Sequence, residues 1–253
     1  MPSYRSVPIV ECGEPLVAIP RDAFGFTDPH PYVVLGAPYG RISPWQLRKS
    51  VLAALLAAQG CLGELQPGWR LKLFDAYRPL AVQSFMVWRE FCRQASLDGA
   101  SLAAFRDPAA LVARDRPLYD RLAATVFTYW GIPSDDPRTP PPHSTGAAVD
   151  LTLEDASGAE ADMGSPIDET TERSDPDHFR NAAEPRLRAA HERRELLHAV
   201  MAAAGFVRHA NEWWHFSLGD QMAAGRSGKP HASYGRAELL PHVTGFPQDG
   251  LRA

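Results

Sequence analysis

The sequence predicts an α+β fold in which a small, mainly antiparallel sheet carries a metal site and helices pack on one side. Two stretches, 69–74 and 147–153, alternate apolar and polar residues, as strands with one buried face do. Two longer stretches, 44–59 and 186–204, repeat apolar residues at helical intervals. The histidines and carboxylates with the most informative spacing lie in or beside the expected strands.

Length and composition are those of an ordinary globular protein. With 253 residues, 45% of them hydrophobic and 22% charged, the chain can build an ample core. We expect one domain over residues 1–253, with an irregular N-terminal part over 1–42 and an irregular C-terminal tail over 220–253, because both ends are rich in Pro and Gly. The sequence does not determine the oligomeric state.

Charge and hydropathy argue against several kinds of partner. A net charge of −4 gives no electrostatic case for nucleic acid or for an anionic membrane. No apolar run approaches the ~20 residues of a membrane span, and the first residues lack the apolar stretch of a signal peptide. The 3 cysteines are widely spaced, which argues against a disulfide framework. The default expectation is therefore a cytoplasmic protein.

The first expected helix covers 44–59. Ser43 is a suitable N-cap, Pro44 suits the first turn, and Gln46 completes a capping-box pattern. Gly60 is a suitable stop. The apolar stripe of this helix consists of Leu47, Val51 and Leu55.

The next part of the chain is expected to alternate between strands and helices. Short strands, such as 32–35, should lie among loops before the first helix. Residues 75–79 should then turn the chain from strand 69–74 into a helix over 80–95. A broken helical region should follow from about 107 to 129.

The strand at 147–153 and the loop before it present the first candidate ligands. Residues 137–142 contain four prolines, so we expect a stiff, extended loop that delivers His143. In the strand, the aliphatic residues should face a core while Asp150 projects from the opposite face. Residues 154–184 are acidic and mostly aperiodic, which indicates a long surface loop and a candidate lid.

A helix over 186–204 and a hairpin should complete the sheet. Gly205 is the expected stop of the helix, and residues 206–208 and 213–218 are the expected antiparallel strands of the hairpin. The candidate core residues of the helix are Leu187, Leu196, Val200 and Met201.

Four side chains in these segments match the needs of a catalytic zinc site. Such a site has three protein ligands and leaves one position open. His143, Asp150 and His215 fit the ligand role, and Glu212 fits that of a base that takes a proton from water. Taken alone, each segment also fits a structural role, either an aromatic-rich strand or a loop histidine beside a strand carboxylate. Residues i and i+3 of a flat strand diverge, so Glu212 and His215 can face one metal only if the backbone bends there.

Four ordered segments resemble motifs of the zinc D-alanyl-D-alanine dipeptidases, the VanX-like branch of the D,D-peptidases with His-x6-Asp and His ligands. They are Asp-Ala-Tyr-Arg-Pro at 75–79, His-Ser-Thr-Gly-Ala-Ala-Val-Asp at 143–150, Met-Gly-Ser-Pro-Ile-Asp at 163–168 and Glu-Trp-Trp-His at 212–215. The resemblance implies that His143, Asp150 and His215 bind one Zn²⁺ and that Glu212 is the catalytic acid/base.

The same resemblance implies roles for residues around the metal. Arg78 would hydrogen-bond the scissile carbonyl oxygen as it becomes an oxyanion, which suits a guanidinium because it stays charged. Asp168 would lie near the substrate's ammonium group, and Tyr77 and Asp75 would belong to the substrate pocket. Taken alone, Arg78 also fits a fold-stabilising pair with Asp75, and Asp168 fits a solvated acid in an acidic loop.

Two positions depart from the family's pattern. Pro141 stands where the family usually has Ser two residues before the first zinc histidine, and Ile167 stands where it usually has Phe. These changes bear on the substrate, whereas the metal ligands and the base are unaltered. A second group of possible ligands, on the expected helix, comprises His191, Glu195 and His198, but it lacks the His-Glu-x-x-His pattern and lies among arginines.

The leading hypothesis is zinc-dependent hydrolysis of a short D-amino-acid dipeptide, with D-Ala-D-Ala as the first candidate. A D,D-carboxypeptidase or a murein endopeptidase would use the same chemistry on a different substrate. A non-catalytic, metal-stabilised binding domain is a further alternative. Structural zinc would need neither Glu212 nor Arg78, so their presence favours an enzyme.

Overall fold

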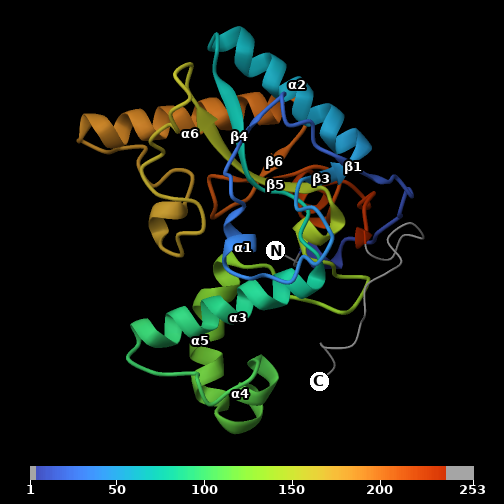
Figure 1. Ribbon diagram of the computed structural model, residues 1–253, viewed down its shortest axis with the longest axis vertical. Coiled ribbons are helices and arrows are strands. Elements are labelled where there is room, and N and C mark those ends of the chain that lie inside the picture. Colours follow the sequence, from blue (N-terminus) through green and yellow to red (C-terminus); the bar gives the residue numbers. More distant parts are fainter. Residues whose placement is uncertain (1–3, 238–253) are drawn as a thin grey trace.

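The sheet that carries the site has five strands in the order β2-β4-β5-β7-β6 (Figure 1). The computed structural model describes residues 4–237; residues 1–3 of the expected N-terminal part and 238–253 of the expected tail lie outside it. All neighbouring strands pair antiparallel except β2 and β4. The strands are β2 (Gly25–Phe26), β4 (Arg70–Asp75), β5 (Ala148–Glu154), β7 (His215–Ser217) and β6 (Val207–Arg208). The predicted α+β class with a mainly antiparallel sheet is confirmed.

The alternation in β5 separates the core from the site. Val149, Leu151 and Leu153 belong to the main hydrophobic core, as predicted. The residues between them, Asp150 and Thr152, are also buried, at 2% and 1% exposure. Because both faces of β5 are covered, the face opposite the core is a protected place for charged groups.

Helices α2 (Lys49–Leu65) and α6 (Pro185–Ala203) contact each other and cover the core face of the sheet (Figure 1). The predicted core residues Val200 and Met201 of α6 are fully buried, and Gly205 follows the helix with the positive φ of a C-terminal stop. Leu187 and Leu196 are only partly buried, since the helix turns Leu197 and Arg194 inward instead.

A second group of helices lies on the other side of the site, in the lower part of Figure 1. It comprises α3 (Leu80–Leu97), α4 (Pro108–Arg114) and α5 (Arg116–Tyr129), which share a separate hydrophobic cluster. The predicted break in the region 107–129 falls at Asp115, which caps α5 by accepting a hydrogen bond from the Leu118 amide.

The prediction of a helix over 44–59 is wrong at both ends. Residues Gln46–Arg48 form strand β3, paired antiparallel with β1 (Leu16–Ala18), and α2 begins only at Lys49. The expected cap at Ser43 does not start the helix, because the residues after it pair with β1 as a strand. Gly60 does not end the helix, which continues to Leu65. Leu62, in the turn after Gly60, is fully buried and packs this turn against the core.

Two further expectations at the ends of the chain need correction. Residues Pro31–Val34 form the short helix α1 and not a strand, because His30 caps it by accepting a hydrogen bond from the Tyr32 amide. The expected irregular tail contains the helix α7 (Gln221–Arg226). Short 3-10 helices cover Tyr4–Ser6 (η1), Pro142–Thr145 (η2) and Glu172–Ser174 (η3).

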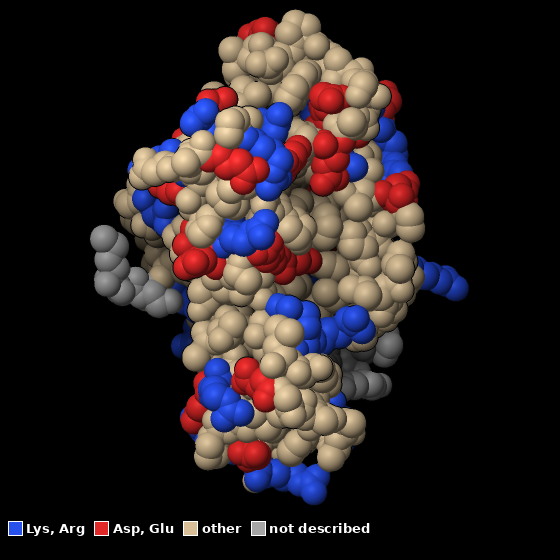
Figure 2. Space-filling model, turned by 90° about the vertical axis from the view of Figure 1, so that its left-hand side faces the viewer, with Lys and Arg blue, Asp and Glu red and all other residues tan. Residues whose placement is uncertain are grey.

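Charged side chains of both signs are interspersed over the face shown in Figure 2. Among residues 4–237, no helix has both the length and the apolarity needed to cross a membrane.

Gly146 should be required for the loop that joins η2 to β5. It has φ +71°, and a Cβ atom there would overlap the Leu16 side chain. We expect Gly146→Ala to lower the free energy of unfolding by roughly 1–2 kcal/mol for the left-handed backbone, and by a further ~1–3 kcal/mol for the overlap. Urea unfolding measures this loss. Gly158→Ala is the matched control, because Gly158 has φ +84° but open space around it; equal losses in the two variants would contradict the prediction.

Candidate metal centre

Strand pairing places three acidic or imidazole side chains in one row across the sheet. Asp75 of β4 is in register with Asp150 of β5, and Asp150 is in register with His215 of β7. His143 comes from η2, directly before β5, where the left-handed turn at Gly146 redirects the chain. Residues separated by 65 positions in the sequence are therefore direct neighbours.

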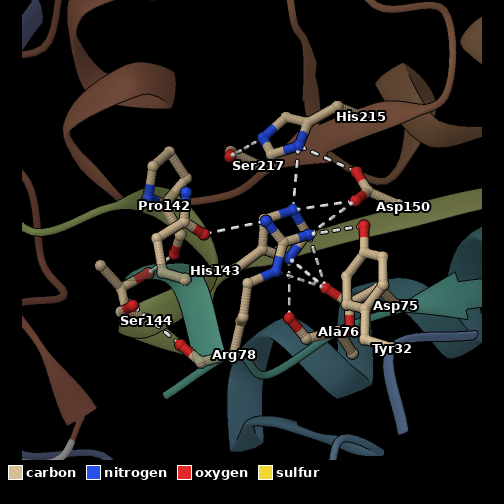
Figure 3. Close-up of polar contacts among 12 residues, drawn as sticks. Tyr32, Asp75, Ala76, Arg78, Pro142, His143, Ser144, Asp150, His215 and Ser217 are labelled. Atoms are coloured by element: carbon tan, nitrogen blue, oxygen red, sulfur yellow. Dashed lines mark hydrogen bonds and ion pairs between the residues drawn. The ribbon is translucent and has the colours of Figure 1, made fainter. Parts of the chain in front are cut away.

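The side chains of His143, Asp150 and His215 converge on one point (Figure 3). The Nε2 atom of His143 lies 3.1 Å from Nδ1 of His215 and 3.1 Å from Oδ2 of Asp150. The same His215 nitrogen lies 2.9 Å from Oδ1 of Asp150. Donor atoms bound tetrahedrally to zinc at ~2.0–2.2 Å lie roughly 3.4 Å apart, so this donor set fits a zinc ion with little movement.

The ring nitrogens of His143 and His215 that point away from the convergence point also have hydrogen-bond partners. Nδ1 of His143 donates to the Ala76 carbonyl oxygen at 2.7 Å, which leaves Nε2 unprotonated and available to a metal. Nε2 of His215 lies 3.3 Å from the Ser217 hydroxyl. Both imidazoles are thus oriented before any metal binds.

Electrostatics couple the three ligands. Burial alone would raise the pKa of Asp150, but His143 and the hydrogen bonds to both imidazoles lower it below its ordinary value. Burial would lower the pKa of His143, but the Asp150 carboxylate outweighs it and raises that pKa. Burial keeps the pKa of His215 below its ordinary value. An ionised carboxylate between two imidazoles is a ligand set suited to a divalent cation.

Arg78 lies beside the ligands, held by a dense set of contacts (Figure 3). It donates to Asp75 Oδ2 from Nε at 2.9 Å and from Nη2 at 2.7 Å, and from Nη1 to Gln83 at 2.9 Å. Its Nη2 also reaches Asp150 at 3.3 Å. Burial would lower the pKa of Arg78, but Tyr32 and the two carboxylates raise it, so the guanidinium stays charged.

Glu212 lies in a bend of the backbone, as is needed for Glu212 and His215 to face the same point. Residues 211–214 are outside the strand, and β7 begins only at His215, so the alternation of a flat strand does not apply to this pair. The Glu212 carboxylate lies 3.8 Å from Nδ1 of His215 and 3.6 Å from Nδ1 of His209. Burial, with Asp150 and Asp168 nearby, raises its pKa well above the ordinary value. A carboxyl group of this kind is suited to hold a proton and return it.

Asp168 is fixed on the same cavity by a residue that sequence reasoning missed. Tyr32 donates to Asp168, with its hydroxyl 2.8 Å and 3.1 Å from the two oxygens, and itself accepts from Arg78 at 3.2 Å. Burial and the Asp150 charge raise the pKa of Asp168 to about 7. Asp168 has φ +66°, an uncommon conformation for a residue other than glycine, which turns its side chain inward.

These groups line a cavity of about 110 Å³. Arg78, His143, Asp150, Asp168, Glu212 and His215 are all in its wall. Asp75 and Tyr77 are fully buried and are not among the lining residues, so the structure places them behind the wall. Sequence patterns do not indicate Gln83, Trp130 or Tyr4, because only the tertiary fold brings their segments to the cavity.

A second group of possible ligands lies on α6 and in the loop before it. Ligand atoms of the loop residue Asp177 and of His191 and Glu195 lie within 4.8 Å of one another, whereas the predicted member His198 is not part of this group. However, Glu195 pairs with Arg208 at 2.9 Å and Asp177 with Arg180 at 2.8 Å. Because arginines already neutralise both carboxylates, this group lacks the free negative charge that a cation needs.

The converging imidazoles and carboxylate, with a glutamate and an arginine on the same small cavity, define a metal-dependent hydrolase. Comparison with known proteins gives the family. A peptidase M15 family model described as D-ala-D-ala dipeptidase matches residues 26–233. The chain belongs to this family of metallopeptidases.

Three relatives named D-alanyl-D-alanine dipeptidase are similar to the chain. The protein from Synechocystis sp. (strain ATCC 27184 / PCC 6803 / Kazusa) is 42% identical over 93% of this chain and 96% of its own length. The protein from Streptomyces coelicolor (strain ATCC BAA-471 / A3(2) / M145) is 35% identical over 68% of this chain and 73% of its own. The protein from Escherichia coli (strain K12) is 47% identical over 30% of this chain and 37% of its own.

The three-ligand arrangement predicts how substitutions affect metal content. His215→Ala should lose stoichiometric zinc, because only two of the three converging donors remain. His209→Ala should keep one zinc per chain, since His209 lies on the same wall but is not one of the donors. Metal analysis after dialysis measures both. Full zinc content in His215→Ala, or its loss in His209→Ala, would show that the ligand set is different.

Proposed function

We propose that the chain hydrolyses D-Ala-D-Ala, or a similar short D-amino-acid dipeptide, with one Zn²⁺ held by His143, Asp150 and His215. The observation that carries this proposal is the arrangement of these three donors, Glu212 and Arg78 around one small cavity. The names of the relatives support the substrate, and family membership supports peptide hydrolysis.

The chain's own residues supply the proton transfers. When bound, zinc would polarise the peptide carbonyl and lower the pKa of a bound water. Glu212 takes a proton from the attacking water and returns it to the amine that leaves. Its burial and its raised pKa suit both steps, because the carboxyl group can hold that proton between them.

Arg78 stabilises the negative charge that develops on the carbonyl oxygen. Its guanidinium is fixed by Asp75 and Gln83 before substrate arrives, so little reorganisation is needed during the reaction. We assign Asp75 to this positioning role. Tyr77, fully buried in the neighbouring turn, supports the wall behind Arg78.

Asp168 receives the substrate's ammonium group, and the buried Tyr32 holds the Asp168 carboxylate from behind. The pKa of Asp168 is raised to about 7, and an ammonium group bound beside it would favour its charged form. The loop over 154–184, which supplies Asp168 and Thr170 to the cavity wall, is the lid of this proposal.

The comparisons favour a dipeptide over the two alternative substrates. The matching family model is described as D-ala-D-ala dipeptidase, and the relative that is 42% identical over 93% of this chain is named D-alanyl-D-alanine dipeptidase. A metal-stabilised binding domain would need neither a buried glutamate of raised pKa nor a preorganised arginine. The free state of Cys12, Cys61 and Cys92 fits the cytoplasmic location that we propose.

Release of D-alanine from D-Ala-D-Ala tests the function directly. Zinc-loaded protein should release it, chelator-stripped protein should not, and Glu212→Gln should keep zinc but lose activity by about 10²–10⁴-fold. Amino-acid analysis and metal content are the measurements. Zinc-loaded protein that leaves D-Ala-D-Ala intact would contradict this substrate, and near-normal turnover by Glu212→Gln would remove that residue from the mechanism.

Arg78→Lys tests the oxyanion role. Lysine carries a similar charge but lacks the fork that holds two contacts to Asp75 while facing substrate, so kcat should fall by about 10²–10³-fold. Zinc content and circular dichroism serve as controls for an intact site. A kcat within about twofold of the wild type, with normal zinc, would place Arg78 in a purely structural role.

A further inference from the structure

An N-terminal strap, defined here as residues Tyr4–Val7, closes part of the cavity wall. Tyr4 lines the cavity together with Trp130, Gly131, His209 and Glu212. Glu212 is close enough to contribute to the raised pKa of Tyr4, although burial is the larger cause. Tyr4 thus shares the cavity wall with the proposed acid/base, although well over a hundred residues separate the two in the sequence.

The strap is fastened on the side of α7 by a buried amide. Gln221 is 3% exposed, and its Nε2 donates to the carbonyl oxygens of Val7 at 2.6 Å, Arg138 at 3.0 Å and Arg5 at 3.1 Å. The fit is close, since a Cβ atom on Gly225 would lie 3.1 Å from Tyr4 Cβ. A side chain at position 225 would therefore push the strap away from α7.

The strap is also tied to the opposite wall. Arg5 donates to the Ile132 carbonyl oxygen at 3.3 Å, directly after the cavity residues Trp130 and Gly131. The strap therefore bridges α7 and the end of α5. A loose terminal segment would not hold a side chain at a fixed place in the wall, but one anchored on both sides can.

The two regions of the wall differ in chemistry. Asp168 offers a carboxylate for an ammonium group, and the buried Tyr32 holds it from behind. The region of Tyr4 and Trp130 is largely aromatic, and the Arg5 guanidinium contacts the Tyr4 side chain. Because Glu212 must reach the leaving amine, the Tyr4 region faces the residue that carries that amine.

We propose that Tyr4 is a specificity-determining residue, which requires the leaving residue to be the last of the substrate by blocking any extension beyond it. This inference rests on the proposed dipeptidase function. The strap, and not only the loops around the metal, would then separate an enzyme that releases a terminal residue from an endopeptidase.

The test compares kcat/KM for D-Ala-D-Ala with kcat/KM for the first bond of the tripeptide D-Ala-D-Ala-Gly, whose cleavage releases D-Ala and D-Ala-Gly, in zinc-loaded protein. Wild type should strongly prefer the dipeptide. Tyr4→Ala should raise the ratio of tripeptide to dipeptide kcat/KM about tenfold or more, equivalent to ~1.4 kcal/mol. Tyr4→Phe keeps the ring and should keep the wild-type ratio, and Gln221→Ala, which releases the strap, should shift the ratio in the same direction as Tyr4→Ala.

The possible failures are distinguishable. Wild type that cleaves the first bond of the tripeptide as well as the dipeptide overturns the proposal, as does an unchanged ratio in Tyr4→Ala with normal zinc content and melting temperature. If wild type cleaves a different dipeptide, D-Ala-D-Ala fails as the substrate, and the same ratio is measured between that dipeptide and its C-terminal extension. Wild type that cleaves no dipeptide overturns both the proposed function and the strap's role.

Discussion

The buried guanidinium of Arg78 is the interaction on which the rest of the site depends. Asp75 and Asp150 lie side by side on β4 and β5, both almost fully buried, and like charges this close repel each other. Arg78 contacts both carboxylates and stays charged. Removing one partner from a buried ion pair costs ~3–5 kcal/mol. Loss of the Arg78 guanidinium would therefore destabilise the pairing of β4 with β5 and the position of Asp150.

Arg78 also joins the two halves of the fold, the sheet with its core and the second hydrophobic cluster. The metal ligands come from the sheet and its loops, whereas Tyr32 and Trp130, whose rings lie 4.9 Å and 5.3 Å from the Arg78 guanidinium, belong to the second hydrophobic cluster. Arg78 occupies the turn between β4 and α3, where the chain passes from one half to the other. The cavity therefore forms where the two clusters meet, with metal chemistry on one side and aromatic walls on the other.

The parts predicted from sequence are those with a local signal. The alternation in 147–153 placed Asp150 away from the core, and the Glu-Trp-Trp-His segment gave His215 and Glu212 together. The strand Gln46–Arg48 was missed because its local sequence suits a helix start, and only pairing with Leu16–Ala18 overrides that preference. Tyr32, Gln83 and Tyr4 had no signal at all, since each reaches the site through packing between distant segments.

The carboxyl groups around the cavity would be stabilised in their charged forms by a divalent cation. Asp150, Asp168 and Glu212 face one buried cavity, and the pKa of the last two is raised because burial and neighbouring carboxylates disfavour their charged forms. Arg78 is already engaged by Asp75, so its charge only partly offsets the others. A bound cation adds positive charge between the two imidazoles and favours ionisation of every carboxyl group around it. Because metal binds the folded arrangement and not the unfolded chain, the same ion that supplies the chemistry would also stabilise the fold around it.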